Sequence, residues 1–563
     1  MGKAFFGLLL FFSISLQGQE NYPKDAFDPP LDIPLILAGN FGELRSNHFH
    51  AGIDIKTQQR QGLPVHSIAD GTVVRIKVAL WGYGKVLYIA HPNGFTSVYG
   101  HLSKFSPTIE NYIKKLQYKK KSYEVETFPD YGELKVKKGE LIAYSGDTGS
   151  SGGPHVHFEI RSTVTEKPIN PILFGFDVRD ATDPTLLEVF GYTLSDDAEI
   201  EQSNDRTQIL FRKQNDGSYL ANPLHAIGTI GFGINAYDRQ DLAANKNGVY
   251  SVKQLVNGKV YTDYDFETFS FSEGRYINTL IDYEYFVTHQ DRIQRCYRVP
   301  GNRLSIYRTL VNDGKITVNE GLTYNVEIQL RDLEDNLTKL IIPVEGKREE
   351  LKIKKDIERT DTYVIAKKPN NFDLGIAKVY FPANTFYDDF YIDLKKGNDT
   401  VRIHNNTVPC HRNFTITFDA SKYSGEDQKQ LFIARLDKYH RPNYITTYKR
   451  GANFTARTRD LGTFTLAKDT IAPTISARNF KEKQWLNNYH YLSFRITDDL
   501  SGINTYNATL NGEWILMEYE PKTNTLTYNF DDRILDKKEC ELQLVVTDNV
   551  GNSSTFTSTF YRK

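Results

Sequence analysis

Short runs in which apolar and polar residues alternate, separated by turn residues, fill most of the chain. Between residues 62 and 161 they read GLPVHSIADGTVVRIKV, GKVLYIAHPNGFTSVYGHL and VKKGELIAYSGDTGSSGGPHVHFEIR. Alternation with a period of two turns one set of side chains toward a core, and Pro-Asn-Gly at 92–94 is typical of a hairpin turn. The pattern predicts short β-strands joined by tight turns.

One segment of this region has a helical period instead. From residue 107 to 117 the apolar residues recur three and four positions apart, at Ile109, Tyr112, Ile113 and Leu116. This spacing predicts a short helix inside an insertion at about 104–135. The basic run Lys119–Lys121 that follows is either a solvated face or a flap beside a functional site.

Beyond residue 180 the chain continues as long alternating strands, and two segments resemble distant copies of one another. Residues 236–258 and 496–512 both contain an aspartate, then Gly-Val or Gly-Ile, then an Asn-Gly hairpin turn. Each is followed by a strand that ends in Asp-x-x-x-Asn, at 329–336 and 545–552. The repetition predicts two β-sandwiches of the immunoglobulin-like type.

We place these two sandwiches at 186–345 and 470–563, with a further β-rich domain at 346–469 and a boundary near Pro473. The aspartate-rich loops could bind calcium, but their spacing matches no EF-hand. Turn formation explains the same aspartates equally well.

The first residues have the layout of a secretory signal peptide. Residues 1–18 contain one lysine, an apolar run from about Ala4 to Leu16, and small or polar residues near Gly18. The run is too short for a mature membrane helix, and no later stretch reaches the roughly 20 apolar residues that a spanning helix needs. We therefore expect an exported protein of the periplasm, cell envelope or extracellular space, without a transmembrane segment.

Composition supports a mainly β protein and limits the binding partners and the metal-binding residue types that can be expected. The 563 residues include 35 tyrosines, 34 phenylalanines and only two methionines, and aromatic residues favour strands. With 69 basic and 70 acidic residues, no bulk charge favours nucleic acid or an acidic membrane as a partner. The three cysteines, at 296, 410 and 540, indicate neither a disulfide framework nor a thiol metal site. Any metal must be bound by histidine and carboxylate.

Seven of the thirteen histidines lie between residues 48 and 157, at 48, 50, 66, 91, 101, 155 and 157. His155 and His157 stand two apart in a predicted strand, so both imidazoles can face one cleft. His50 and Asp54 form a second pair, in HFHAGIDI. Each pair alone is weak evidence. Their order, with Tyr-Gly-His-Leu at 99–102 between them, is specific.

The ordered set resembles the lysostaphin-like, LytM-type zinc endopeptidases, which cut peptide cross-links in bacterial cell walls. The matching segments are HFHAGIDI, ADGTVVRI, GYGKVLYIAH, TSVYGHL, VKKGELIAYSGDTG and GPHVHFEI. They lie within a core of about 40–165, in a domain that we place at 19–180. The resemblance implies an antiparallel β-sheet peptidase domain with an inserted helix.

The resemblance also implies the roles of five residues. His50, Asp54 and His157 would bind one zinc ion per chain. His155 and His101 would fall on the two catalytic positions that are not ligands, His155 as general base and His101 as stabiliser or acid, although these two roles could be exchanged. No His-Glu-x-x-His helix occurs, so histidine must act as the base.

Four further residues are assigned lesser parts. His48 also precedes Asp54, but the His-x-x-x-Asp spacing favours His50 as the ligand. We therefore interpret His48 as a residue of the groove wall or as a neighbour that contacts a ligand, with the role of ligand as the alternative. His66 and His91 are interpreted as structural. Glu159 lies on the metal-facing side of its strand and could hydrogen-bond a ligand.

These assignments predict a secreted zinc metalloendopeptidase that hydrolyses stem peptides or cross-links of peptidoglycan. The alternative is a non-catalytic LytM-like protein that binds the cell wall or activates a separate amidase. A third possibility makes the C-terminal β-domains an adhesion array. The presence of all three ligands and both catalytic histidines favours the enzyme. The sequence specifies neither the scissile bond nor the oligomeric state.

Overall fold

A computed structural model describes residues 22–356, 359–532 and 537–563. The predicted signal peptide lies outside the described residues. The prediction of a mainly β chain is confirmed, because strands from β1 to β47 account for most of the regular structure. Within the described ranges, no helix has the length and apolar character needed to cross a membrane.

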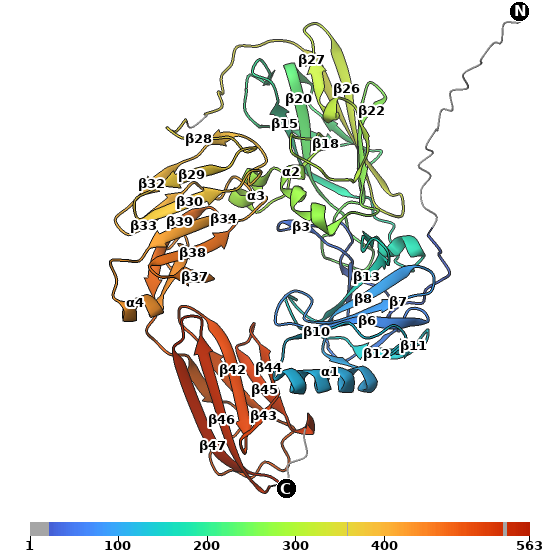
Figure 1. The fold of residues 1–563 in the computed structure, drawn as a ribbon. Coiled ribbons are helices and arrows are strands. Elements are labelled where there is room, and N and C mark those ends of the chain that lie inside the picture. The colour runs from blue at the N-terminus through green and yellow to red at the C-terminus, as the bar shows by residue number, and fades with distance from the viewer. Residues whose placement is uncertain (1–21, 357–358, 533–536) are drawn as a thin grey trace, which may run out of the picture.

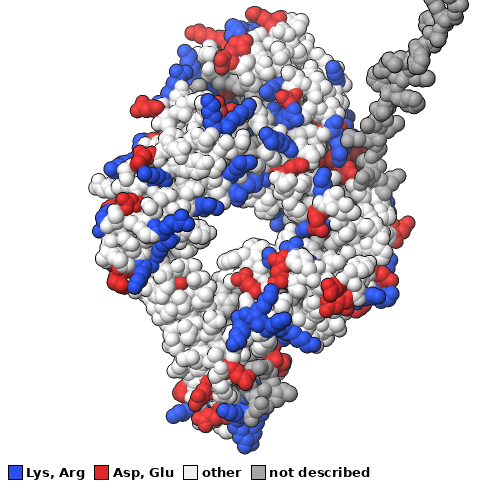
Figure 2. All heavy atoms as spheres, in the orientation of Figure 1, with Lys and Arg blue, Asp and Glu red and all other residues white. Residues whose placement is uncertain are grey.

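Four domains follow one another around a ring, and the last returns to the first (Figure 1). We refer to residues 22–180 as the N-terminal domain, 181–346 as the second, 361–469 as the third and 470–563 as the C-terminal domain. The space-filling view keeps an opening at the centre of the ring and shows acidic and basic side chains interspersed over the visible face (Figure 2).

The N-terminal domain is built on an antiparallel sheet with the order β1-β4-β13-β8-β7-β6-β10. The strands of this path are β1 Leu37–Gly39, β4 Ile53–Lys56, β13 His155–Ser162, β8 Phe95–Leu102, β7 Lys85–Ala90, β6 Gly71–Val78 and β10 Val125–Thr127. A second, three-stranded sheet pairs β5 Pro64–His66 and β9 Lys104–Phe105 with β12 Leu141–Tyr144. One face of the large sheet is fully buried at Ile53, Tyr99 and Phe158. The opposite face carries polar side chains on β4 and β13, beside a small apolar cluster of Val86, Tyr88 and Val98 on β7 and β8.

The predicted helix is present as α1, Pro107–Lys120. Proline in its first turn suits the start of a helix, and Lys121 ends it in a left-handed conformation. Ile109 and Ile113 are buried against the sheet, and Lys119 and Lys120 are exposed at the end of the helix.

The second domain consists of sheets joined by one long strand, β20 Leu224–Tyr237. The first residues of β20 pair with β27 Leu337–Gly346, and the residues after Gly228 pair with β15 Thr185–Thr193. Gly228 has a φ of 77°, which permits the bend where the strand changes partners. The same domain contains β26 Thr323–Arg331 and two short helices that the sequence did not predict, α2 Ile277–Leu280 and α3 Tyr283–His289.

The third and C-terminal domains each consist of two sheets around one apolar core. In the third domain the sheets have the orders β29-β30-β34-β38-β37 and β32-β33-β39-β35-β36. Their strands are β29 Asn370–Asp373, β30 Ala377–Phe381, β32 Leu394–Lys396, β33 Thr400–Ile403, β34 Phe414–Asp419, β35 Leu431–Leu436, β36 Pro442–Ile445, β37 Thr447–Arg450, β38 Asn453–Thr458 and β39 Gly462–Lys468.

In the C-terminal domain the orders are β40-β41-β45-β44 and β43-β42-β46-β47. The strands are β40 Thr474–Ala477, β41 Tyr491–Thr497, β42 Ile503–Leu510, β43 Glu513–Ile515, β44 Met517–Glu520, β45 Thr525–Asn529, β46 Glu539–Asp548 and β47 Ser553–Tyr561.

Apolar contacts join the N-terminal domain to two other domains of the ring. Phe41 and Phe49 insert into the core of the second domain, where both rings contact Phe269. On another side, α1 meets the C-terminal domain through Tyr118, whose ring packs edge-on against Trp514. No residue of α1 is among those that line the groove described below, so the interpretation of the lysine run as a flap over the site receives no support.

Candidate metal centre and active-site groove

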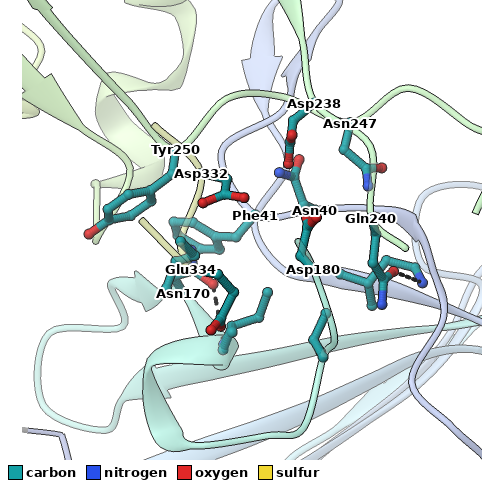
Figure 3. Close-up of a pocket in the computed structure, with 14 residues that line it drawn as sticks. Asn40, Phe41, Asn170, Asp180, Asp238, Gln240, Asn247, Tyr250, Asp332 and Glu334 are labelled. Atoms are coloured by element: carbon teal, nitrogen blue, oxygen red, sulfur yellow. Dashed lines mark hydrogen bonds between the residues drawn. The ribbon is translucent and has the colours of Figure 1, made fainter. Parts of the chain in front are cut away.

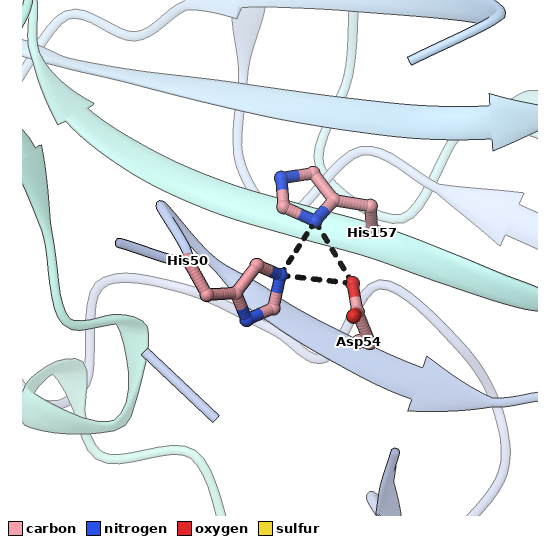
Figure 4. A group of neighbouring side chains, drawn as sticks. All are labelled: His50, Asp54 and His157. Carbon is pink, nitrogen blue, oxygen red and sulfur yellow. Dashed lines mark hydrogen bonds and ion pairs between the residues drawn. The ribbon is translucent and has the colours of Figure 1, made fainter. Parts of the chain in front are cut away.

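Two neighbouring strands bring the predicted ligands together. Strand β13 pairs with β4 in a register that places His157 opposite Asp54. His50 lies in the turn just before β4, in the segment that Phe49 anchors in the second domain. Figure 4 shows the three side chains converging from these two places in the chain.

Three particular atoms face one another. His50 Nε2 lies 3.0 Å from Asp54 Oδ1 and 3.0 Å from His157 Nδ1, and His157 Nδ1 lies 2.9 Å from Asp54 Oδ1. Tetrahedral ligands about 2.0–2.1 Å from a zinc ion would lie about 3.3 Å apart, which is close to these separations. All three residues are buried.

Hydrogen bonds on the far side of each ligand fix its orientation. His50 Nδ1 donates to the Asn40 carbonyl oxygen at 2.7 Å, which leaves Nε2 with its lone pair. His157 Nε2 donates to Glu159 Oε1 at 2.8 Å, so Nδ1 is the nitrogen that faces the cluster. Arg45 Nη2 donates to Asp54 Oδ2 at 2.6 Å and leaves Oδ1 free. The donor set therefore fits a zinc ion with three protein ligands and an open position.

Glu159 is the centre of the network behind His157. It is fully buried, and it accepts hydrogen bonds from Arg161 Nε at 2.6 Å and from the Tyr83 hydroxyl. Burial alone would raise the pKa of Glu159, but Arg161 and His157 lower it to about 2, so the carboxylate is ionised. The Tyr83 ring also stacks on His157, with ring centroids 4.7 Å apart.

The charges around the two imidazole ligands give them opposite pKa shifts when no metal is bound. Burial lowers the pKa of His50 to about 4. Burial would also lower the pKa of His157, but hydrogen bonds to Asp54 and Glu159 outweigh it and raise the pKa to about 9. His157 must therefore lose a proton before Nδ1 can bind a metal.

The glycine-rich loop 147–153 holds the other two predicted site residues. His155 Nδ1 donates to the Gly153 carbonyl oxygen at 2.8 Å, and its Nε2 lies 3.4 Å from Asp54 Oδ1. His101 Nδ1 donates to the Thr148 carbonyl oxygen at 2.8 Å. In both rings Nε2 is then the free acceptor, and the ring centroids lie 4.7 Å apart.

His101 has two further distinctive properties. Its φ of 59° is a left-handed conformation that residues other than glycine rarely adopt and that is found preferentially at functional sites. Burial and the nearby His157 and His155 lower its pKa to about 3, so the ring is neutral.

A groove passes over the cluster. Its walls are the segment 33–38, residues 56–59 after β4, and the glycine-rich turn 150–154, with His101, His155 and Asp54 at the floor. Leu242 of the second domain also lines it. The groove is thus formed by two domains.

The remaining histidines of this region lie outside the cluster. His48 is exposed, and its Nδ1 hydrogen-bonds the Ser46 carbonyl oxygen. It is not among the residues that line the groove, so the interpretation of His48 as part of the groove wall is wrong. His91 is buried between the Asp70 carbonyl oxygen and Ser97 Oγ, and His66 contacts Asp32 and the Gly139 carbonyl oxygen.

The sequence analysis named Glu159, which does hydrogen-bond His157, but it missed Arg45, Asn40 and Tyr83. Arg45 and the Asn40 carbonyl lie before the first recognised motif and have no periodic signal. Tyr83 stands inside GYGKVLYIAH, and only its place in that motif could have drawn attention to it.

Comparison with known families agrees with this geometry. Residues 48–118 and 131–171 match the family described as Peptidase family M23, and residues 361–469 match the family described as Zu5-like domain. The interruption at 119–130 lies inside the predicted insertion. The Zu5-like match falls in the region that the sequence had identified only as β-rich.

Individual relatives match the same N-terminal part. The DD-carboxypeptidase/endopeptidase Mpg of Neisseria meningitidis is 35% identical over 139 residues, which are 25% of this chain and 26% of that protein. Peptidoglycan DD-endopeptidase ShyB of Vibrio cholerae is 32% identical over 121 residues, 22% of each protein. A solved zinc containing peptidase from Vibrio cholerae is 26% identical, covering 27% of this chain and 41% of that one with a TM-score of 0.20. The chain spans about a quarter of the length of the curated relatives it matches.

Proposed function

We propose that this chain, whose N-terminal domain matches peptidase family M23 over residues 48–118 and 131–171, is an exported zinc-dependent endopeptidase that cleaves peptide cross-links of peptidoglycan. The observation that carries the proposal is the convergence of His50 Nε2, Asp54 Oδ1 and His157 Nδ1 beneath an open groove. Three acceptor atoms that face one another, each oriented by a hydrogen bond from behind, form a site for a cation.

Zinc, when bound, would lower the pKa of a coordinated water and polarise the carbonyl group of the substrate. His155 Nε2 is the acceptor nearest to the cluster, so we assign it the proton of the attacking water. His101 is neutral in the resting protein. It would stabilise the carbonyl oxygen or protonate the leaving amine only after taking up a proton during the reaction.

The names of two relatives favour one of the candidate scissile bonds in peptidoglycan. Both Mpg and ShyB are named as enzymes that act on DD bonds. We therefore propose a cross-link between D-amino acid centres rather than a glycine bridge as the scissile bond.

Peptidoglycan digestion followed by mass analysis of the products tests the proposal. The mature chain should release cleaved cross-links, a zinc chelator should abolish the release, and added zinc should restore it. His50→Ala, Asp54→Ala and His157→Ala should lose both zinc and turnover. His155→Ala and His101→Ala should keep zinc while turnover falls by about 100-fold or more.

His48→Ala is the matched control, because it removes a neighbouring imidazole that is outside the cluster. It should retain zinc and turnover, and zinc loss in this variant alone would make His48 the ligand. Unchanged muropeptides in the presence of stoichiometric zinc would contradict the enzyme and favour the non-catalytic alternative.

A further inference from the structure

A second cluster of metal-binding side chains lies between the N-terminal and second domains. Asp180 belongs to the segment that connects the two domains, Asp238 directly follows β20, and Asp332 directly follows β26. Each offers a carboxylate oxygen within 4.8 Å of the other two. The three line a pocket together with Asn40 and Asn247 (Figure 3).

These carboxylates lack the partners that buried charges require. Asp238 is 4% exposed and Asp332 is 5% exposed. Across the residues that the structure describes, Asp238 Oδ1 has no hydrogen-bond partner and none of the three aspartates forms an ion pair with a basic side chain. Leaving a buried charge unpaired is costly, so the cluster requires a proton or a cation.

Burial and the neighbouring carboxylates raise the pKa values of two of the aspartates. Burial, followed by Asp180 and Asp332, raises the pKa of Asp238 to about 8. Burial also raises the pKa of Asp180 to about 6, with Asp332 and Asp241 adding to the shift. Without a cation, Asp238 therefore holds a proton at neutral pH, which a bound cation would displace.

Asn336 holds the Asp332 carboxylate in position and links it to the backbone of Asp180. Its backbone N–H donates to Asp332 Oδ1 at 2.8 Å, and its side-chain Nδ2 donates to Asp332 Oδ2 at 2.6 Å. The same Nδ2 lies 3.2 Å from the Asp180 carbonyl oxygen. These bonds fix Asp332 beside the connecting segment and leave Asp238 without such support.

The C-terminal domain contains a similar group of three aspartates with an asparagine, which can be compared with this cluster. Asn552 binds Asp548 through its backbone N–H and its Nδ2, each at 2.8 Å, and its Nδ2 lies 3.1 Å from the Asp469 carbonyl oxygen. There the third aspartate, Asp498, accepts backbone N–H groups from Leu500 and Gly502. Asp238 Oδ1 has no such donor, so the cluster of the second domain is the one that calls for a ligand.

The type of ligand atom indicates which class of metal ion the cluster would bind. All the candidate ligands are oxygens, which hard divalent cations prefer over zinc or copper. Two oxygens that bind one calcium ion, each about 2.4 Å from it, lie at most about 4.8 Å apart, and the three carboxylate oxygens lie within that limit. Water would complete the six to eight ligands that calcium takes.

We propose that Asp180, Asp238 and Asp332 bind one calcium ion, which holds the loop 238–248 against the N-terminal domain. This loop already contacts that domain. Gln240 accepts from the Leu37 N–H at 2.7 Å and donates to the Leu35 carbonyl oxygen at 2.8 Å. Leu242 in the same loop lines the groove. The ion therefore stabilises the junction that forms one wall of the groove.

Calcium titration of the full mature chain, freed of calcium by a chelating resin and reloaded with zinc, tests the site. Calorimetric titration with calcium chloride should give binding to the wild type and a rise of several degrees in Tm. Asp238→Asn should weaken calcium binding by about 100-fold and abolish the rise. Without calcium at neutral pH, this variant should be about as stable as the wild type, because the raised pKa already keeps the Asp238 carboxyl protonated there.

Two control variants distinguish loss of the calcium site from loss of a surface charge and from loss of the proposed zinc site. Asp335→Asn makes the same substitution in the turn that carries Asp332, where the side chain is 80% exposed, and should bind calcium like the wild type. His157→Ala, which removes the proposed zinc site, should also keep its calcium binding, so the failure of one site is distinguishable from failure of the other. Absence of binding at 10 mM calcium, about equal binding by Asp238→Asn and the wild type, or preference for magnesium would each overturn the proposal.

Discussion

At the scale of single residues, the candidate metal centre depends on hydrogen bonds that orient the three proposed ligands as well as on the ligands themselves. The Asn40 carbonyl selects the tautomer of His50, Glu159 selects that of His157, and Arg45 occupies the second oxygen of Asp54. Each of these bonds leaves one atom facing the centre. A histidine or aspartate at the right place in the sequence would not suffice, because a ring turned by 180° would present a bonded N–H instead of a lone pair.

The pKa of His157 gives a pH-dependent prediction. Without metal this residue holds an extra proton below pH about 9, and zinc must displace it. Zinc affinity should therefore rise with pH between 6 and 8, by up to about tenfold per pH unit. Zinc competition with a chromogenic chelator at several pH values measures the affinity, and titration in buffers of different ionisation enthalpy counts the released proton.

Glu159→Gln tests whether the Glu159 carboxylate raises the pKa of His157. With the carboxylate gone, the pKa of His157 should fall, so the dependence of zinc affinity on pH should flatten near neutrality. The affinity at pH 8 should also decrease, by about 10-fold to 100-fold. Glu166→Gln is the control, since Glu166 contacts the same Arg161 from an exposed position. A pH slope unchanged in Glu159→Gln would show that Asp54 alone raises the pKa.

At the scale of secondary-structure elements, local patterns predicted what lies on one strand or one helix. Alternation in HVHFEI indicated correctly that His155 and His157 share a face, and the period of 107–117 indicated α1. The family resemblance added Asp54 and His101, which no local pattern brings near His157. The pairing of β13 with β4 that unites His157 and Asp54 spans about a hundred residues, so it could not be derived from either segment alone.

Helices α2 and α3 show where local patterns fail. Their sequence, INTLIDYEYFVTH, is rich in aromatic and β-branched residues that favour strands. Asp282 caps α3 by accepting from the Tyr285 N–H, and Ile277 and Leu280 are buried in the second domain. Tertiary packing therefore outweighs the intrinsic preference of these residues.

Packing between elements also positions a ligand. Phe49 precedes His50 and contacts Phe266 and Phe269 of the second domain. Phe269→Ala should lower the free energy of unfolding by about 3–4 kcal/mol, because the ring is buried and its removal leaves a cavity. It should also weaken zinc binding, since the segment that carries His50 loses its anchor. Denaturant unfolding and zinc competition measure the two effects.

The control for this change is Phe128→Ala, which removes the same side chain from a position that is 68% exposed. Its effect on stability should be within about 0.5 kcal/mol, with no effect on zinc. If Phe269→Ala destabilised the protein but left zinc affinity unchanged, the second domain would support the fold without positioning the ligand.

At the scale of the whole molecule, the C-terminal domain closes the ring on the wall of the groove. Lys522 donates to the Asp147 and Ser151 carbonyl oxygens, in the loop that holds His101 and His155. Glu518 Oε2 lies 2.9 Å from the buried Lys85 Nζ, and Lys114 of α1 pairs with Asp532. These polar contacts place a domain more than 300 residues away in the sequence against the active-site region.

Removing two of these contacts should open the ring. In Glu518→Gln with Lys522→Ala, Lys85 would remain buried without an anionic partner, a loss of about 2 kcal/mol for this contact. The radius of gyration from small-angle X-ray scattering should increase. Glu539→Gln with Lys537→Ala makes the same change in charge at exposed positions of the same domain and should leave the radius unchanged.

Burial would raise the pKa of Glu518, but Lys85 outweighs it and lowers the pKa. The contact is therefore fully present above the ordinary glutamate pKa of about 4.3 and should be lost as pH falls below it, so the wild type should also expand in acid. A radius that stayed the same in the double variant would show that apolar contacts such as Tyr118 with Trp514 hold the ring closed by themselves.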